Sequence, residues 1–213
     1  MTPWLLIPVK SFTTGKSRLT PFLEHGTRRQ LNEFFLYRVL ETASHYPGHD
    51  HTAFISDCDE VIAMVEAYGF LAIRQTGGAG LNTAAAQGVA ELRRRAAWPV
   101  LLMPCDEPDV RPADLRRIAA IGASTGRIVI CPDKHGTGTN ALYLPPDARM
   151  EFQFGEGSLE RHCDEARRIG FEPRVYYNPR IAFDIDAPQD LLTWTGGPPP
   201  LDAASPLNYC LQF

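Results

Sequence analysis

The stretch PVLLMPCDEPDVRPADLRRIAAIG, residues 99–122, contains the pattern that decides the fold. It begins with a short apolar run, which is typical of a buried strand. It ends in an amphipathic segment that starts at Pro112, a residue suited to the first turn of a helix, and stops at Gly122. An acidic turn around Asp106 separates the two parts. The stretch therefore predicts a strand, a loop and a helix in that order.

The same alternation of apolar runs and amphipathic segments recurs along the chain. A helical stretch from about Thr27 to His45 follows the run WLLIPV (4–9), and further strand-like runs are AFIS (53–56) and RIVIC (127–131). This rhythm indicates βαβ units, so we expect an α/β fold with a mostly parallel mixed sheet flanked by helices. Later runs, among them PRVYY (173–177) and RIAF (180–183), suit added antiparallel strands.

Length and composition exclude several classes of protein. The 213 residues, 44% of them hydrophobic, fit one globular domain with a sizeable core. The formal net charge of -4 argues against a broad electrostatic grip on nucleic acid. No apolar run reaches the roughly 18 residues that a membrane span needs, so we expect a cytoplasmic protein without a membrane partner. The five cysteines are scattered and include no C-x-x-C pair, which predicts neither a disulfide framework nor a zinc site.

The chain divides into a domain of residues 1–195 and a tail of residues 196–213. The tail begins with GGPPPLDAASPL, in which three consecutive prolines forbid a helix and favour an extended path. Its last residues include several apolar ones, which a disordered segment rarely has. We expect the tail to pack, either over its own domain or across the interface of a homodimer.

The first apolar run is followed by a loop with the composition of a phosphate site. Lys10, Lys16 and Arg18 lie in the segment KSFTTGKSR, which also carries hydroxyl side chains and Gly15. Loops at the carboxyl ends of parallel strands are where such sheets bind ligands. The segment matches neither the P-loop nor the G-x-G-x-x-G motif, so a solvated basic loop remains an alternative.

Three aspartates are candidates for a metal site. Asp106 follows a buried run, and Asp184 and Asp186 lie two residues apart in AFDIDAP. If that segment is extended, both of its carboxylates share one face. Three converging carboxylates repel one another unless a cation lies between them, and their hard oxygens suit Mg²⁺ or Mn²⁺. The alternative is structural, because Asp186 or Asp190 could cap a helix that begins near Pro188.

Three loops rich in small residues each have two possible roles. The segment PDKHGTGTNAL (132–142) is either a turn or a loop whose glycines let the backbone approach a ligand. In FGEGS (154–158), Ser158 begins a helix and, with the exposed N–H groups, could hold an anion. In GGAGLNTAAAQG (77–88), Asn82 either caps a helix or presents its amide to a nucleobase.

Six sequence blocks occur in an order that is specific to one enzyme family. They are PVKSFTTGKSRL, GLNTAAAQG, MPCDEPD, PDKHGTGTNAL, FGEGSLERH and FDIDAPQDL. Together they resemble the signature blocks of the CofC-type guanylyltransferases, which act in biosynthesis of the deazaflavin coenzyme F(420), and the resemblance covers about residues 4–192. It implies a nucleotidyltransferase fold of the glycosyltransferase-A type, similar to that of the molybdenum-cofactor guanylyltransferase.

The resemblance also implies a role for each candidate residue. The implied metal ligands are Asp106, Asp184 and Asp186. The basic residues expected to hold the phosphates of GTP, which with Asp106 form the catalytic set, are Lys10, Lys16 and Arg18. The acceptor acid would be bound by Thr139, Gly155 and Ser158. The guanine would lie near Leu81 and Asn82.

The implied reaction is a Mg²⁺-dependent transfer of GMP from GTP to the phosphate of a small phospho-acid, with release of pyrophosphate. The acid remains open among 2-phospho-L-lactate, phosphoenolpyruvate and 3-phospho-D-glycerate. The implied partners are these two substrates, a second copy in a homodimer, and a downstream transferase that receives the labile product. Two alternatives remain: another nucleotidyltransferase of this fold, acting on a sugar phosphate or cofactor, and a non-catalytic nucleotide-binding subunit.

The sequence departs from the family pattern at CDEPD (105–109), where Ala-Asp-Leu-Pro-Leu is usual. Glu107 and Asp109 add two acidic side chains beside Asp106. They bear on the coordination of the metal and on the choice of nucleotide.

Overall fold

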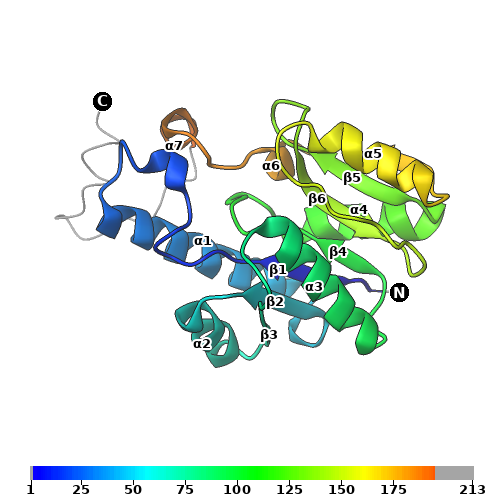
Figure 1. Cartoon of the computed structure of the whole chain (residues 1–213), viewed down its shortest axis with the longest axis horizontal. Coiled ribbons are helices and arrows are strands. Elements are labelled where there is room, and N and C mark those ends of the chain that lie inside the picture. The colour runs from blue at the N-terminus through cyan, green and yellow to red at the C-terminus, as the bar shows by residue number, and fades with distance from the viewer. Residues whose placement is uncertain (1, 195–213) are drawn as a thin grey trace.

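A seven-stranded sheet forms the centre of the computed structural model, which describes residues 2–194 (Figure 1). The predicted tail, residues 196–213, lies outside the described residues. The strands are β1 Trp4–Pro8, β2 Thr52–Ser56, β3 Leu71–Arg74, β4 Val100–Leu102, β5 Ile128–Pro132, β6 Thr139–Leu144 and β7 Pro173–Val175. Their order in the sheet is β3-β2-β1-β4-β6-β5-β7, and every pairing is parallel except the two that β6 makes, with β4 and β5. The predicted α/β fold with a mostly parallel sheet is confirmed.

Helices cover both faces of the sheet. The longer helices are α1 His25–His45, α2 Asp59–Ala67, α3 Leu81–Arg94, α4 Pro112–Thr125 and α5 Ser158–Arg168. The short elements are α6 Pro179–Ala182, α7 Pro188–Thr193 and the 3₁₀ turns Ser17–Leu19 and His49–His51. Apolar side chains of α1, α2 and α4 share one buried cluster with the sheet, while those of α3 and α5 share the other. Figure 1 shows α3 and α5 on the same side of the sheet.

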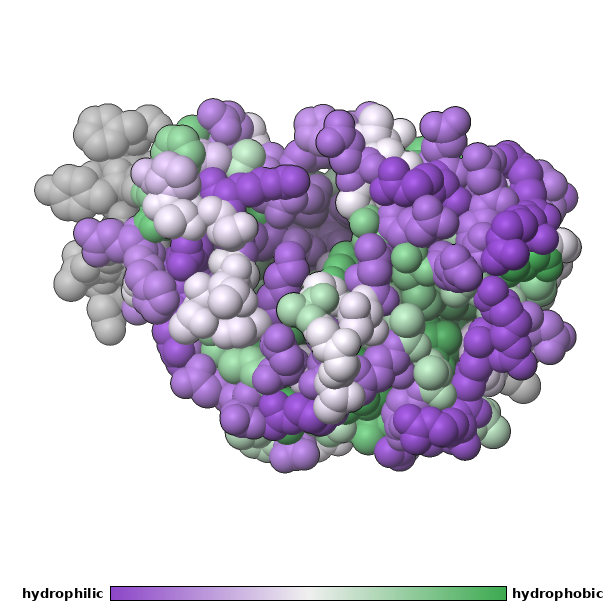
Figure 2. Space-filling view, in the orientation of Figure 1, coloured by the Kyte–Doolittle hydropathy of each residue, from purple (hydrophilic) through white to green (hydrophobic). Residues whose placement is uncertain are grey.

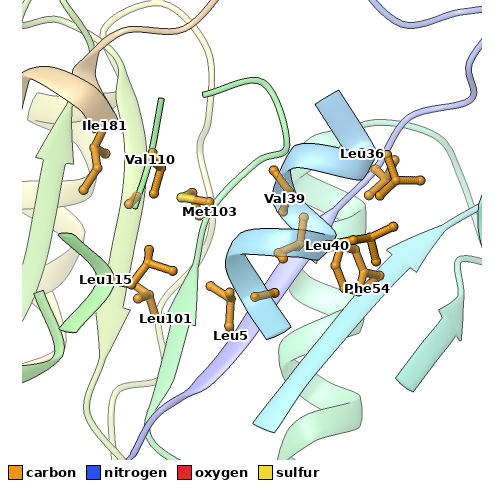
Figure 3. Close-up of a cluster of buried hydrophobic side chains, with 14 of the residues drawn as sticks. Leu5, Leu36, Val39, Leu40, Phe54, Leu101, Met103, Val110, Leu115 and Ile181 are labelled. Carbon is orange, nitrogen blue, oxygen red and sulfur yellow. The ribbon is translucent and has the colours of Figure 1, made fainter. Parts of the chain in front are cut away.

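Alternation along β1 explains the two-sided core. Leu5 and Ile7 belong to the cluster on the α1 face, and Leu6 between them belongs to the cluster on the α3 face. All three are fully buried, as expected for a central strand of a parallel sheet that is covered on both sides. Figure 3 shows the first cluster, in which Leu36 and Leu40 of α1 lie close to the strands.

A third cluster joins segments that are far apart in the sequence. It contains Leu19, Leu23, Leu31, Phe35, Ile185, Leu191 and Trp194. These residues come from the loop after β1, from the first half of α1 and from the segment around α7. Figure 1 shows these parts together at the left of the molecule. The cluster therefore holds the basic loop after β1 against the segment that carries the D-x-D pair.

Three local predictions were wrong. The run PRVYY contributes strand β7, but this strand pairs parallel with β5 and not antiparallel. The run RIAF forms no strand, because the Asn178 side chain accepts hydrogen bonds from the backbone N–H groups of Arg180 and Ile181 and thereby starts the short helix α6. Gly122 does not end α4, which continues to Thr125 and stops at Gly126 with φ of 65°. A Cβ atom at Gly122 would lie 2.2 Å from the Tyr143 ring, so this glycine serves close packing of α4 on β6.

The described residues show neither a disulfide nor a membrane span. Cys58, Cys105, Cys131 and Cys163 are all free thiols. From residue 2 to residue 194, no helix has both the length and the apolar character that crossing a bilayer requires.

Candidate active site

A cavity of about 840 Å³ opens at the carboxyl edge of the sheet, where β1 and β4 lie side by side. From β1 the strand order continues to β2 and β3 on one side and to β4 on the other, and ligand crevices in α/β sheets form at such a switch point. Figure 2 shows a hollow with a mainly hydrophilic surface between the two halves of the molecule. The cavity lining includes every residue that the sequence predicted for the site: Lys10, Lys16, Arg18, Leu81, Asn82, Asp106, Thr139, Gly155, Ser158, Asp184 and Asp186.

The basic loop after β1 places one buried ammonium between two carboxylates. Lys16 Nζ lies 2.6 Å from Asp106 Oδ2 and 3.2 Å from Asp186 Oδ1. Lys16 has a left-handed backbone with φ of 55°, which is uncommon for a residue with a side chain and is held here by the surrounding loop. Arg18 Nη1 lies 2.9 Å from Asp186 Oδ2, and Lys10 is exposed at the cavity. The loop is therefore built into the site rather than merely solvated.

Charge pairing controls the ionisation of these groups. Burial would raise the pKa of the Asp106 carboxyl, but the charge and hydrogen bond of Lys16 outweigh it and the pKa is lowered. Burial would likewise lower the pKa of Lys16, but the charges of Asp106 and Asp186 raise it. The pKa of Asp184 is raised, by burial first and by the charge of Asp106 second. At neutral pH, Lys16 and Asp106 form a charged pair.

The three aspartates line one cavity, but they do not form a ready-made metal site. Within residues 2–194, no group of three or more His, Cys, Asp or Glu side chains is arranged to hold a metal ion. Lys16 is shared by Asp106 and Asp186, whereas Asp184 Oδ1 lies 3.6 Å from Lys134 Nζ. Shared coordination of one cation by the three carboxylates stays a prediction.

The structure decides which acidic side chain caps α7. Asp190 Oδ2 accepts hydrogen bonds from the backbone N–H groups of Asp186 and Ala187, at 2.9 and 2.7 Å. The side chain of Asp186 is directed instead to Lys16 and Arg18. Because Asp190 performs the capping, the carboxylate of Asp186 remains on the cavity side.

Close backbone approach explains the glycines of the loop between β5 and β6. Asp133 Oδ1 accepts hydrogen bonds from the N–H groups of Thr137 and Gly138, both at 2.9 Å. A Cβ atom at Gly138 would lie 2.8 Å from Asp133 Oδ2, and Gly136 has φ of 71°. The loop is thus a tight turn, and it also lines the cavity with Thr137, Gly138 and Thr139. The turn is therefore confirmed, and close approach of this backbone to a ligand stays a prediction.

The FGEGS loop lies beside that turn and opens α5. The helix begins at Ser158, as predicted, after Gly157 in a left-handed conformation. The backbone N–H of Leu159 donates to the carbonyl of Thr137 at 3.0 Å, which joins the two loops. Ser158 Oγ is buried and has no hydrogen-bond partner among the described residues. The backbone N–H of Ser158 donates to the carbonyl of Gly155 at 3.1 Å, so the hydroxyl of Ser158 is the donor that this turn keeps available for an anion.

Asn82 does not cap a helix. The cap of α3 is Gly80, without a side-chain hydrogen bond, and Asn82 lies inside the first turn. Its amide instead exchanges two hydrogen bonds with the backbone of Phe154, accepting from the N–H at 2.7 Å and donating to the carbonyl at 3.3 Å. Asn82 therefore fixes the FGEGS loop to α3, while also lining the cavity beside Leu81.

The two acids that depart from the family pattern have different environments. Asp109 Oδ1 accepts a hydrogen bond from the Trp194 indole at 3.0 Å, so it helps to hold the segment after α7. Glu107 is buried, and neither carboxylate oxygen has a partner among the described residues. Burial, followed by the charges of Asp106 and Asp184, raises the pKa of Glu107 well above its usual value. Glu107 is not among the residues that line the cavity.

Two further residues support the site and were missed by sequence reasoning. Lys134 Nζ donates to the carbonyl of Asp184 at 2.8 Å and lies 2.6 Å from Asp190 Oδ1, so it joins the loop after β5 to the D-x-D segment. His162 of α5 is fully buried and contacts Thr139 through its ring. Lys134 lies in the block PDKHGTGTNAL and His162 in FGEGSLERH, but no role was predicted for either, because each acts through contacts that are distant in the sequence.

Comparison with known proteins shows the family of the chain. Residues 4–195 match the family model described as "Guanylyl transferase CofC like". The chain belongs to this family. Among the curated family members, the chain is 34% identical to the phosphoenolpyruvate guanylyltransferase of Rubrobacter xylanophilus, over 90% of this chain and 92% of the relative. It is 31% identical to the 2-phospho-L-lactate guanylyltransferase of Methanothermobacter thermautotrophicus, over 87% and 81%.

Solved structures support the fold of this CofC-like guanylyltransferase. The model resembles 4-diphosphocytidyl-2C-methyl-D-erythritol synthase with a TM-score of 0.61 and 11% identity, over 89% of this chain and 96% of that one. At this level of identity the likeness concerns the fold alone. The predicted family and nucleotidyltransferase fold are confirmed, and the enzyme class is that of a guanylyltransferase.

Proposed function

We propose that the protein transfers GMP from GTP to the phosphate of a three-carbon phospho-acid, either phosphoenolpyruvate or 2-phospho-L-lactate, with 3-phospho-D-glycerate as a third candidate. The names of the curated relatives support the first two acids. The observation that carries the proposal is a cavity whose lining includes basic, acidic and hydroxyl residues from several loops. This combination suits the binding of two phosphorylated substrates side by side, so that one phosphate can react with the other.

In this proposal the basic loop holds the triphosphate. Lys10 and Arg18 lie at the exposed side of the cavity, where they can contact phosphate oxygens. Lys16 lies deeper, fixed by two carboxylates. The guanine is assigned to the side of the cavity formed by Leu81 and Asn82, at the start of α3.

The acceptor acid is assigned to the turn before β6 and to the neighbouring FGEGS loop. Thr139 begins β6, and Gly155 and Ser158 belong to the loop and first turn of α5. The unpartnered Ser158 hydroxyl and the dipole at the start of an eleven-residue helix support an anion at this position.

Catalysis in this site is mainly positioning and neutralisation of charge. An oxygen of the acceptor phosphate forms a bond to the α-phosphorus of GTP, and the bond between that phosphorus and the bridging oxygen to the β-phosphate breaks, releasing pyrophosphate. The attacking oxygen is already anionic, so no general base is required. Basic side chains stabilise the negative charge that develops on the leaving pyrophosphate.

The site also fits a divalent cation in its donor chemistry. Asp106, Asp184 and Asp186 line the same cavity with hard oxygen donors, and the buried Asp184 Oδ1 has no hydrogen-bond partner among residues 2–194. These three residues would hold Mg²⁺ or Mn²⁺. When bound, the ion supplies charge neutralisation at the phosphates.

The decisive experiment is a substrate screen. The protein is incubated with GTP and Mg²⁺ and with each of the three acids in turn, and pyrophosphate and the mass of the coupled product are measured. ATP and CTP replace GTP in parallel reactions. We expect a guanylylated acid and pyrophosphate in equal amounts, with GTP favoured. Product formation only with a sugar phosphate, or from CTP, would replace this proposal by another nucleotidyltransferase activity, and nucleotide binding without product would indicate a non-catalytic subunit.

The proposal extends to the context of the reaction. The product belongs to the biosynthesis of coenzyme F(420) in the cytoplasm, and its diphosphate linkage is labile, so a downstream transferase would receive it. We also propose that residues 1–195 form the catalytic domain, that residues 196–213 form a tail, and that two copies of the chain form a homodimer. Light scattering tests the last point, because a dimer doubles the measured mass.

A further inference from the structure

His162 lies beneath the proposed acceptor subsite with both ring nitrogens in hydrogen bonds. Nε2 accepts from the backbone N–H of Gln153 at 3.0 Å, and Nδ1 lies 3.0 Å from Thr139 Oγ1. The ring also makes an edge contact with Phe154 at a centroid distance of 4.9 Å. The residue is fully buried in α5, so the ring is held on several sides.

The first hydrogen bond determines where the ring proton lies. A backbone N–H can only donate, so Nε2 must accept and carries no proton. Burial, with a contribution from Arg161, lowers the pKa of His162 to about 4, while Glu165 acts in the opposite direction. The ring is therefore neutral at pH 7 and its single proton lies on Nδ1. Nδ1–H then donates to the Thr139 oxygen.

This arrangement leaves the Thr139 hydroxyl proton for the cavity. The oxygen of Thr139 accepts from His162, so its own O–H cannot point at the ring. Among residues 2–194, His162 is the sole hydrogen-bond partner recorded for this hydroxyl, and Thr139 lines the cavity. Ser158, one turn before His162 in α5, supplies a second hydroxyl, which is buried without a partner. Two hydroxyl donors are thus available where the acid is assigned.

We propose that His162 is a positioning residue: by donating its Nδ1–H to Thr139, it commits the Thr139 hydroxyl to donate to an anionic oxygen of the acceptor acid. The inference rests on the proposed function, which places the acid between Thr139 and Ser158. With the opposite tautomer, Thr139 would donate its hydroxyl proton to the ring. The lone pairs of its oxygen would then face the anion and repel it. The backbone N–H of Gln153 therefore sets the tautomer of His162, and His162 in turn sets the direction of the Thr139 hydroxyl.

The tautomer can be tested without any substrate. The ring ¹⁵N shifts of ¹⁵N-histidine-labelled protein are measured at pH 7, and the His162 signals are assigned by their loss in His162→Gln. We expect a protonated Nδ1 and an unprotonated Nε2. A protonated Nε2, or a doubly protonated ring, would overturn the inference whatever the enzyme turns out to transfer.

A double-mutant cycle tests the effect on the acid. In His162→Gln, the side-chain amide takes the position of Nε2, where its oxygen can still accept from the Gln153 N–H. Its NH₂ group lies at that end of the side chain too, so the donor at the position of Nδ1, which faces Thr139, is lost. We expect the KM for phosphoenolpyruvate to rise about five- to tenfold and the KM for GTP to change less than about twofold. The double variant His162→Gln/Thr139→Val should have the same KM for phosphoenolpyruvate as Thr139→Val alone. The exposed His25, replaced by glutamine, is the matched control and should behave as the wild type.

Two results would contradict the proposal in this cycle. The first is an unchanged KM for phosphoenolpyruvate in a folded His162→Gln variant. The second is a rise that adds in full to that of Thr139→Val, because an independent effect on the loop would produce it. If His162→Gln does not fold, the ring ¹⁵N shifts of the wild type decide, with assignment by comparison with variants of the other histidines. Absence of any product from the wild type with the three acids would instead contradict the proposed function, leaving the tautomer measurement valid.

Discussion

Replacing Lys16 by methionine would remove the ammonium that joins two separate parts of the active site. Lys16 belongs to the loop after β1, Asp106 follows β4, and Asp186 precedes α7. Methionine keeps much of the length and apolar stem of lysine, so packing against Phe35, whose ring centroid lies 5.7 Å from Nζ, is largely preserved. The variant therefore isolates the loss of charge.

The expected cost follows from the two contacts. A hydrogen bond between charged groups contributes about 1.5–3 kcal/mol when it is well shielded. The Lys16 side chain is only 6% exposed, but those of Asp106 and Asp186 are 31% and 39% exposed, so water and salt compensate part of the loss. We expect the free energy of unfolding to fall by about 1–3 kcal/mol at pH 7.

The pH dependence has a definite sign. The pKa of Asp106 is lowered in the folded protein, so the stability from this pairing is fully present above the unfolded value of about 3.9 and is lost as the pH falls through the folded value. The pKa of Lys16 is raised, so its contribution is lost only as the pH rises beyond the unfolded value of about 10.4 and through the folded one. The difference in the free energy of unfolding between the wild type and Lys16→Met should therefore become smaller below about pH 4.

Urea unfolding at pH 7 and at acid pH, followed by circular dichroism, measures this difference. Lys10→Met is the matched control, because Lys10 is exposed at the same cavity and forms no hydrogen bond to a carboxylate within residues 2–194. Its effect should stay within about 0.5 kcal/mol. If Lys16→Met were no less stable than Lys10→Met, Lys16 would not join the two parts of the site, and the reasoning would fail.

Three further predictions concern single positions. Asp184→Asn should lower turnover by roughly two to four powers of ten with an unchanged melting temperature, and near-normal turnover would remove it from the metal site. Ser158→Ala should raise the KM for the acid by an amount equivalent to about 1–3 kcal/mol while the KM for GTP changes little, and equal weakening of both substrates would contradict its assignment. Gly122→Ala should lower the free energy of unfolding, measured by thermal unfolding, by about 1–3 kcal/mol, because its Cβ would meet the Tyr143 ring. Gly26→Ala, where a Cβ meets nothing within 4 Å, should be neutral or stabilising in the same thermal unfolding experiment.

Much of the fold could be predicted because its signals are local. Apolar runs and amphipathic segments alternate, and polar residues follow each run, so parallel strands bring those residues to one edge of the sheet. The predicted helix from Thr27 to His45 differs from α1 only at its start, at His25. The run RIAF was misinterpreted because its apolar residues resemble a strand, whereas the Asn-Pro pair before it starts a helix.

The details of the site could not be predicted, because they depend on distant contacts. The ion pair of Lys16 with Asp186 joins residues separated by 170 positions, and no local pattern indicates it. Gly122 could be interpreted as a helix end from the sequence, since only the three-dimensional structure places Tyr143 against it. For the same reason, the sequence could not show that Asp190 and not Asp186 caps α7, or that Asn82 caps no helix, although all three residue types suit a cap.

Lys134 gives two parts of the cavity wall, the turn before β6 and the aspartate segment, a common mechanical support. Its ammonium comes from the turn that leads into β6, and it contacts the carbonyl of Asp184 and the carboxylate of Asp190. A displacement of the turn therefore strains the aspartate segment, and a displacement of that segment strains the turn. Under the proposed function, in which the turn contacts the acid and the aspartate segment contacts the nucleotide through a cation, such coupling is reciprocal in free energy. The factor by which the acid changes the affinity for the nucleotide then equals the factor by which the nucleotide changes the affinity for the acid.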